Sequence, residues 1–162
     1  MSTLPRPEDR RAVTAVLAGG LIAGAIDLTY ACTYHGLAHA IPPVRILQSI
    51  ASGWFGRASF DMGAESAAIG FVTHFAILIV AAAIFEIARR QIAFLRERAY
   101  LAGMAFGVAI YLVMNLVVLP LSAAPHFNAS MPTRISDFAV HVLLLGPAIA
   151  LCARHFDRAA RR

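Results

Sequence analysis

Four apolar runs, each about as long as a bilayer is thick, constrain this chain more than any other feature. A transmembrane helix needs about 20 mostly apolar residues to cross the hydrocarbon core. The runs cover residues 12–34, 67–88, 99–121 and 136–153. Charged residues make up 14% of the 162 residues, against about 25% in soluble domains. The sequence therefore predicts a single all-α membrane domain over 1–162, a bundle of four transmembrane helices in a lipid bilayer.

The basic residues predict the orientation of the chain. All 14 are arginines, and eleven of them lie in the two tails and in the connection 89–98. The other three are Arg45, Arg57 and Arg134. Because arginine is enriched in cytoplasmic loops, we expect a multi-pass protein of the bacterial inner membrane with cytoplasmic N- and C-termini. Topology and anionic lipid explain the net charge of +5, so no nucleic-acid partner is predicted.

The connection between the first two spans contains a stretch, 43–58, that is too short to cross a membrane. Its apolar residues recur at helical spacing and are Ile46, Leu47, Ile50, Trp54 and Phe55. Tryptophan is typical of the lipid headgroup region. We expect an amphipathic interfacial helix on the periplasmic surface. The alternative is a loop folded over the mouth of the bundle.

The two halves of the chain resemble one another in short motifs. LAG at 17–19 matches LAG at 101–103, and FVTH at 71–74 pairs with FAVH at 138–141. Both hairpins would run in the same direction across the membrane. The pattern therefore predicts an internal repeat of two parallel helix hairpins, related by an axis along the membrane normal.

Pairs of glycines four residues apart occur in the first and third spans. They are Gly20 with Gly24, and Gly103 with Gly107. Small residues at this spacing let helix backbones touch inside a membrane, so we expect these glycines to form helix-packing faces. If the faces instead contact another copy or another membrane protein, the chain is a structural partner subunit of a larger complex.

Polar side chains from all four spans are predicted to lie at a similar depth. Counting ~1.5 Å per residue, Asp27 and Asn115 lie roughly 24–26 Å from the cytoplasmic edge of a ~30 Å core. His74 and His141 lie roughly 11–14 Å from the other edge. Asp137 is one helical turn before His141, so their side chains can meet. The sequence thus predicts a polar pocket in the periplasmic half.

Two interpretations of this pocket remain open. Ionisable side chains inside a membrane are costly, and they either mark a functional site or satisfy one another as a structural clasp. Our leading hypothesis is a non-enzymatic protein whose pocket senses or relays protons or binds a small ligand. The residues of that site are Asp27, His74, Asn115, His141 and Asp137. Soluble-type catalysis is not predicted, because phosphate-loop, Cys-x-x-Cys and Gly-x-Ser-x-Gly motifs are absent from the sequence. No cofactor is predicted.

Histidine pairs offer two cofactor-binding alternatives. His74 and His141 would face one another across the bundle and ligate a haem b, which would make the chain a redox protein. His35 and His39 are one helical turn apart. They would hold a divalent metal at the outer rim, with Asp61 or Glu65 as the third ligand.

Five short motifs give the chain a resemblance to a known family. They are GLIAG (20–24), THF (73–75), LAGMAFG (101–107), LPLSAAP (119–125) and FAVHV (138–142). In these motifs, which cover most of the four spans, the chain resembles the YagU-like family of small bacterial inner-membrane proteins. The resemblance implies a four-helix inner-membrane protein and names no substrate. It adds weight to His74 and His141, whose positions match the family pattern, whereas the outer connection departs from it.

Overall fold

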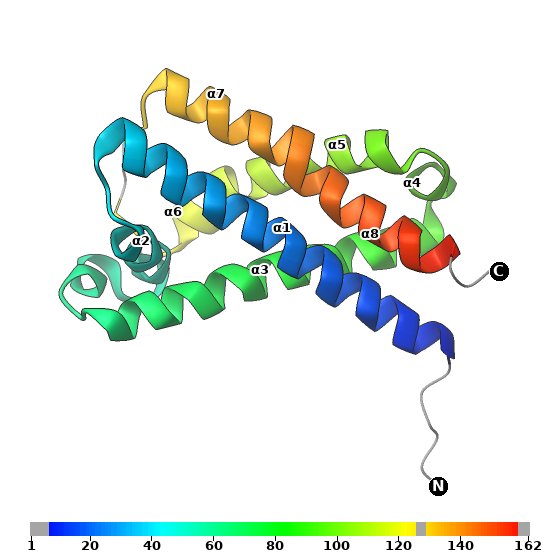
Figure 1. Cartoon of the computed structure of the whole chain (residues 1–162), viewed down its shortest axis with the longest axis horizontal. Helices are drawn as coiled ribbons and strands as arrows, with labels where there is room; N and C mark the ends of the chain where they lie inside the picture. Colours follow the sequence, from blue (N-terminus) through cyan, green and yellow to red (C-terminus); the bar gives the residue numbers. More distant parts are fainter. Residues whose placement is uncertain (1–6, 126–128, 159–162) are drawn as a thin grey trace, which may run out of the picture.

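Four long apolar helical segments dominate the computed structural model, which describes residues 7–125 and 129–158 (Figure 1). The segments long and apolar enough to span a membrane are Asp9–His39, Ala64–Gln91, Ala99–Leu121 and Met131–Asp157. Large apolar side chains are exposed on all four, as expected where lipid covers them. The described ranges contain no strand. The predicted all-α four-helix membrane bundle is therefore confirmed.

The first three spans follow the predicted runs and extend past the ends of some of them. The first span is α1 (Pro7–His39) and the second is α3 (Ala64–Gln91). The third is built from α5 (Ala99–Val113), the π-helical η2 (Met114–Val118) and the short α6 (Leu119–Leu121). Hydropathy marks only the part of a helix that lies in lipid, whereas backbone hydrogen bonds continue into its polar ends. The helices are therefore longer than the apolar runs that reveal them.

The fourth span is interrupted in the same way as the third. It consists of α7 (Met131–Val140), the π-helical η3 (His141–Leu145) and α8 (Gly146–Arg158). It begins well before the predicted residue 136 because Ser130 caps the helix, and its hydroxyl accepts a hydrogen bond from the backbone N–H of Thr133. Arg6, Arg161 and Arg162, which contributed to the charge count, lie outside the described residues.

Each π-helical segment ends two residues before a proline. η2 precedes Pro120, and η3 precedes Pro147. A proline inside a helix has no N–H to donate, and its ring clashes with the carbonyl four residues earlier. Widening the preceding turn to a π-helix is a common way for a helix to accommodate such a defect. Hydropathy alone predicts continuous helices here, although both prolines lie inside the predicted runs.

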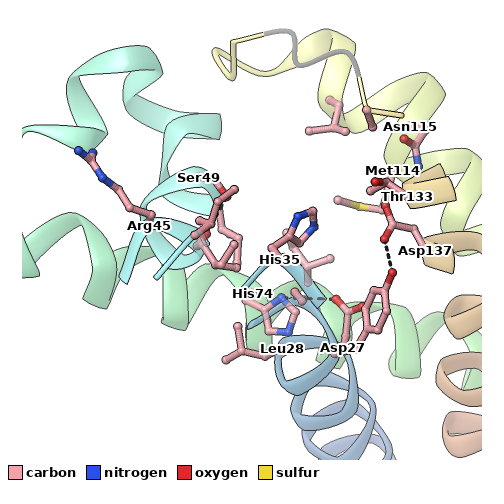
Figure 2. Close-up of a pocket in the computed structure, with 18 of the residues that line it drawn as sticks. Asp27, Leu28, His35, Arg45, Ser49, His74, Met114, Asn115, Thr133 and Asp137 are labelled. Atoms are coloured by element: carbon pink, nitrogen blue, oxygen red, sulfur yellow. Dashed lines mark hydrogen bonds and ion pairs between the residues drawn. The ribbon is translucent and has the colours of Figure 1, made fainter. Parts of the chain in front are cut away.

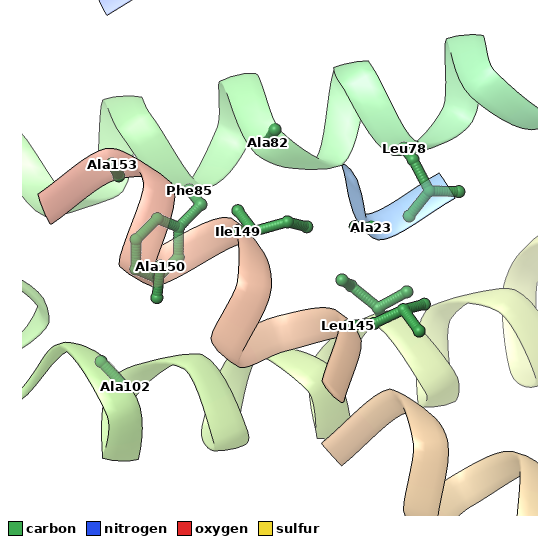
Figure 3. Packing of buried hydrophobic residues seen from close by; sticks show 10 residues of the cluster. Ala23, Leu78, Ala82, Phe85, Ala102, Leu145, Ile149, Ala150 and Ala153 are labelled. Atoms are coloured by element: carbon green, nitrogen blue, oxygen red, sulfur yellow. The ribbon is translucent and has the colours of Figure 1, made fainter. Parts of the chain in front are cut away.

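Small residues bring the helices together in the half of the bundle that carries both termini (Figure 1). A Cβ on Gly20 would lie 2.6 Å from Cα of Ile79 in α3, and one on Gly103 would lie 2.6 Å from Cα of Pro147 in α8. Between these contacts lies an apolar cluster (Figure 3). It consists of Ala23, Leu78, Ala82, Phe85, Ala102, Ile110, Leu145, Ile149, Ala150 and Ala153. We call this part the closed half.

Ion pairs join the helices at the termini end of the closed half. Glu86 pairs with Arg89 and Arg90 on its own helix, and Nη1 of Arg89 lies 3.7 Å from a carboxylate oxygen of Asp157 in α8. The helix α4 (Ala93–Glu97) then leads directly into α5. These contacts connect α3 to α8 where the polar ends of the spans meet.

The helix predicted over 43–58 forms as α2 (Pro43–Phe55), followed by the 3₁₀ turn η1 (Gly56–Phe60). Figure 1 shows α2 nearly end-on while the spans run across the picture, so α2 crosses the spans instead of following them. Its backbone packs directly on α3, because a Cβ on Gly70 would lie 2.8 Å from the carbonyl carbon of Leu47. The helix is amphipathic, and it also covers the mouth of the bundle.

The two hairpins contact one another through their first helices, α1 and α5, to different extents. α1 packs along both α3 and α8. The counterpart contact in a repeat would join α5 to α3, and there the rings of Phe106 and Phe85 meet with centroids 5.1 Å apart. The internal repeat therefore stays a prediction from the sequence.

Candidate functional site

A cavity of about 1190 Å³ lies in the half of the bundle opposite the termini, which we call the open half. Its walls come from α1, α2, α3 and the two π-interrupted spans (Figure 2). The residues predicted for a ligand or proton site all line it, and they are Asp27, His74, Asn115, Asp137 and His141. Most of the remaining wall is apolar. The cavity is at or above the ~300–1,000 Å³ of ordinary small-molecule sites.

Asp27 and His74 form a pair at the centre of the wall. Oδ2 of Asp27 lies 4.0 Å from Nδ1 of His74, with side chains 22% and 8% exposed. On its other side the imidazole Nε2 donates to the carbonyl oxygen of Gly24 at 3.0 Å. Because a carbonyl can only accept, Nε2 carries a proton and Nδ1 is the nitrogen that faces the carboxylate. A proton added to either atom would turn this acceptor–acceptor contact into a donor–acceptor contact.

Gly24 makes this geometry possible. A Cβ at this position would lie 2.7 Å from Cδ1 of Phe75, the residue that follows His74. Without that Cβ, α1 and α3 approach closely enough for an imidazole on α3 to reach a backbone carbonyl on α1. The second glycine of the Gly20/Gly24 pair therefore serves both helix packing and the site.

Asp137 brings a second carboxylate to the cavity. Its Oδ1 accepts a hydrogen bond from the hydroxyl of Tyr30 at 2.7 Å, which links α7 to α1. Asp27 lies within electrostatic range of both Asp137 and His141. Within the turn, Nδ1 of His141 donates to the backbone carbonyl of Asp137 at 2.8 Å, and direct contact of the two side chains stays a prediction. One helical turn lets the imidazole reach that carbonyl.

Asn115 lines the cavity without joining the other polar groups. Its Nδ2 donates to the backbone carbonyl of Tyr111 at 2.9 Å, and the residue is exposed. A short amide side chain readily bonds the carbonyl one turn earlier in its own helix. The predicted group of one polar residue from each span therefore reduces to Asp27, His74 and the Asp137–His141 turn.

The mouth of the cavity combines basic and aromatic groups. The rings of His35 and His39 lie 5.5 Å apart. Nη1 of Arg45 donates to the carbonyl of Phe60 at 3.0 Å, and its guanidinium carbon lies 5.5 Å from the centre of that ring. Arg45 is therefore held on the α2 side, and Figure 2 shows it directed away from Asp27.

The three-ligand metal site stays a prediction from the sequence. Over 7–125 and 129–158 no group of three or more His, Cys, Asp or Glu side chains is close enough to hold a metal ion. Glu65 is exposed in the first turn of α3, because the neighbouring Ser66 is buried and donates to the carbonyl of Ser59 at 2.6 Å. His35 and His39 therefore lack this third ligand.

The haem alternative is disfavoured by the contacts of His74. Both of its ring nitrogens face protein atoms, Nε2 at Gly24 and Nδ1 at Asp27. Axial ligation of an iron would require one of these contacts to break.

Sequence reasoning missed the tyrosines that join α1 to α7. Tyr30 bonds to Asp137, and the hydroxyl of Tyr34 lies 3.3 Å from Oγ1 of Thr133. Their rings stack with centroids 5.5 Å apart. Tyr30 follows Asp27 by three residues, so it lies on the same side of α1. That spacing is the signal that would have identified it.

No protein-family model, no curated protein and no solved structure matches this chain. The resemblance to the YagU-like family stays a prediction from the sequence. In this four-span membrane protein, the polar residues predicted for a ligand or proton site all line one cavity.

Proposed function

We propose that the chain is a non-enzymatic protein of the bacterial inner membrane that senses protons from the periplasmic side. The observation that carries this proposal is the Asp27–His74 pair in an open cavity at membrane depth. Nε2 of His74 donates to the carbonyl of Gly24. The atoms that remain to gain or lose a proton are therefore Nδ1 of His74 and the carboxylate of Asp27. Intramembrane carboxylate and histidine groups are typical of proton-responsive sites.

Sensing fits the geometry better than relay through the membrane. On α3 the next ionisable residue toward the termini is Glu86, twelve residues and about 18 Å beyond His74. Leu78 and Phe85, both nearly fully buried, belong to the apolar cluster between them. A proton that reaches Asp27 from the cavity meets a dry barrier in the closed half. It therefore binds and returns by the same route.

Several other charges would shape the response of the pair. The groups that face the cavity beside Asp27 and His74 are Asp137, His141, His35, His39, Asp61, Arg45 and Arg57. Asp137 adds negative charge near Asp27 and is bonded to α1 through Tyr30. A proton gained by the pair reduces the negative charge between α1 and α7. We infer that this changes the balance of forces across the open half.

The orientation rests on the arginine distribution, with eleven of 14 on the termini side. It predicts that a C-terminal reporter that folds only in the cytoplasm is active. An inactive C-terminal reporter, with activity instead from a periplasmic enzyme fused at the same place, would place the cavity on the cytoplasmic side.

The single tryptophan offers a direct test of proton sensing. Nε1 of Trp54 donates to Oγ1 of Thr73 at 3.0 Å, and Thr73 precedes His74 in α3. In lipid nanodiscs the Trp54 fluorescence should change between neutral and acidic pH. Asp27→Asn should abolish the change or move its midpoint by about one pH unit or more, since one partner of the pair no longer binds a proton.

Glu65→Gln is the matched control, because it also removes one negative charge. Glu65 is exposed in the first turn of α3, the helix that carries His74. This variant should titrate like the parent. If the parent shows no acid response, or Asp27→Asn responds as the parent does, the proton-sensing proposal fails. If Asp27→Asn then differs from the parent in thermal stability only, the pair is a structural clasp.

A further inference from the structure

Of the three carboxylates that line the cavity, Asp27 and Asp137 have no guanidinium within ion-pair distance in the described ranges. Within the described ranges, the ion-pair contact of Asp27 is with His74, and Asp137 is bonded to Tyr30. The side chain of Arg45 is held at the carbonyl and ring of Phe60. Figure 2 shows Asp27 and Asp137 on neighbouring parts of the wall and Arg45 across the cavity, directed away from both. This part of the cavity therefore carries two carboxylates whose close partners are an imidazole and a hydroxyl, with Arg45 directed elsewhere.

The rest of the wall suits an apolar molecule. Leu28, Ile77, Met114 and Leu145 line the cavity from four different segments of the chain. An aliphatic wall offers no coordination to a bare metal ion, and carboxylates repel an anion. The wall therefore favours a ligand with a large apolar body.

Aromatic rings complete the binding surface. Tyr30 and Tyr111 also line the cavity, and the ring of Tyr111 lies 5.6 Å from that of His141. Tyrosine rings attract cations through their faces, and a carboxylate nearby adds to the attraction. Carboxylates with flanking aromatic rings are a recurrent way to bind an organic ammonium.

We propose that the cavity binds an organic cation with an apolar body, and that its charged centre lies between Asp27 and Asp137. This inference rests on the proposed function in that the same carboxylates bind protons. Protons and the organic cation then compete for one site. The volume of about 1190 Å³ leaves room for the apolar body against the aliphatic wall.

Equilibrium binding of radiolabelled tetraphenylphosphonium to protein in nanodiscs tests the proposal. Its charge is permanent, so the probe itself has no proton to lose. Tetraphenylborate is the matched probe, with nearly the same size and apolar surface and the opposite charge. The parent and Glu65→Gln should bind tetraphenylphosphonium saturably above protein-free nanodiscs and should not bind tetraphenylborate. Asp27→Asn and Asp137→Asn should each weaken binding at least tenfold.

Asp27→Glu keeps the charge, and its affinity for tetraphenylphosphonium should stay within severalfold of the parent's. This variant distinguishes loss of the charge from loss of the fold. The proposal is overturned by absent saturable binding, by equal binding of tetraphenylborate, or by unchanged affinity in Asp27→Asn. The acid response of Trp54 without probe is measured in parallel. A normal acid response without probe binding rejects the organic cation alone, whereas probe binding without an acid response rejects proton sensing alone.

Discussion

The closed and open halves of the bundle are built from the same four spans and pack in opposite ways. In the closed half, glycine and alanine bring α1 against α3 and α5 against α8. In the open half, α7 is joined to α1 through the hydroxyls of Tyr30 and Tyr34. One half is filled by side chains, and the other encloses about 1190 Å³.

A single face of α1 shows the cause of the difference. Gly20 and Gly24 lie against α3, whereas Asp27, Tyr30 and Tyr34 follow on the later turns. In a membrane, apolar burial gives helices little reason to associate, so close packing and hydrogen bonds must hold them together. Small residues allow the close packing, and large polar residues provide hydrogen bonds between helices that lie further apart. The change from glycine to tyrosine along α1 therefore separates a solid half from a hollow one.

The joint between the halves is a place where two spans meet backbone to backbone. A Cβ on Gly146 would lie 2.8 Å from Cα of Gly107, and Gly146 directly follows η3. Gly103 and Pro147 meet beside it. The π-helical segment thus ends where the tight packing begins, and α7 continues beyond it as a wall of the cavity.

The largest expected effect comes from filling this joint. Gly146→Leu places a side chain where α5 has its backbone, and it should lower the free energy of unfolding by about 3 kcal/mol or more, at or above the usual cost of overpacking. The measurement is the yield of monodisperse protein and its denaturant unfolding in detergent. Gly36→Leu is the control, because the nearest atom to its Cβ is 3.8 Å away. Equal stability of the two variants would show that the helices do not touch at Gly146.

A smaller effect is expected from hollowing the closed half. Phe85 is 1% exposed, and Phe85→Ala should cost about 2 kcal/mol, below the ~3–5 kcal/mol of soluble cores because lipid is as apolar as the core. Phe71→Ala, on the open half of the same helix and 46% exposed, should cost less than about 1 kcal/mol. Thermal unfolding in one detergent compares them. Similar losses would mean that the two halves are packed alike.

The smallest expected effect is at the link across the open half. Tyr30→Phe removes the bond to Asp137 and should cost about 0.6 kcal/mol, the average for interhelical hydrogen bonds in a membrane protein. Hydrogen exchange over 131–140 should become faster, since α7 loses one of its contacts with α1. Tyr100→Phe, 48% exposed at the start of α5, should leave that exchange unchanged. Equal exchange in both variants would show that Tyr30 does not hold α7.

Much of the architecture could be predicted because hydropathy is local. Long apolar runs identify the spans, and the helical spacing of apolar residues in 43–58 identifies α2. Pro120 and Pro147 alone do not locate the π-helical segments, since a proline in a helix can also produce a simple kink. Their positions depend on how neighbouring helices receive the freed backbone groups.

The candidate site was likewise predicted in part from the sequence and decided in part by the packing of the helices. Asp27 and His74 are predicted to share one pocket from their depth in the membrane, and both line the cavity. The partners were harder to foresee, because Asp137 bonds to Tyr30 and Asn115 bonds back to Tyr111. Each of these polar groups has several partners within reach of one helical turn. Helix spacing predicts the neighbourhood of a side chain, and only the packing of the bundle selects its hydrogen bond.

The sequence by itself determined that the chain spans a membrane four times and carries acidic and histidine side chains among its spans. It could do so because the length and periodicity of apolar residues along a helix are properties of the chain alone. Tertiary structure decided that the spans close on one side and open on the other. It also decided that His74 faces Asp27 while resting on the carbonyl of Gly24. Those contacts join residues far apart in the chain, and their distances follow from how closely two backbones approach.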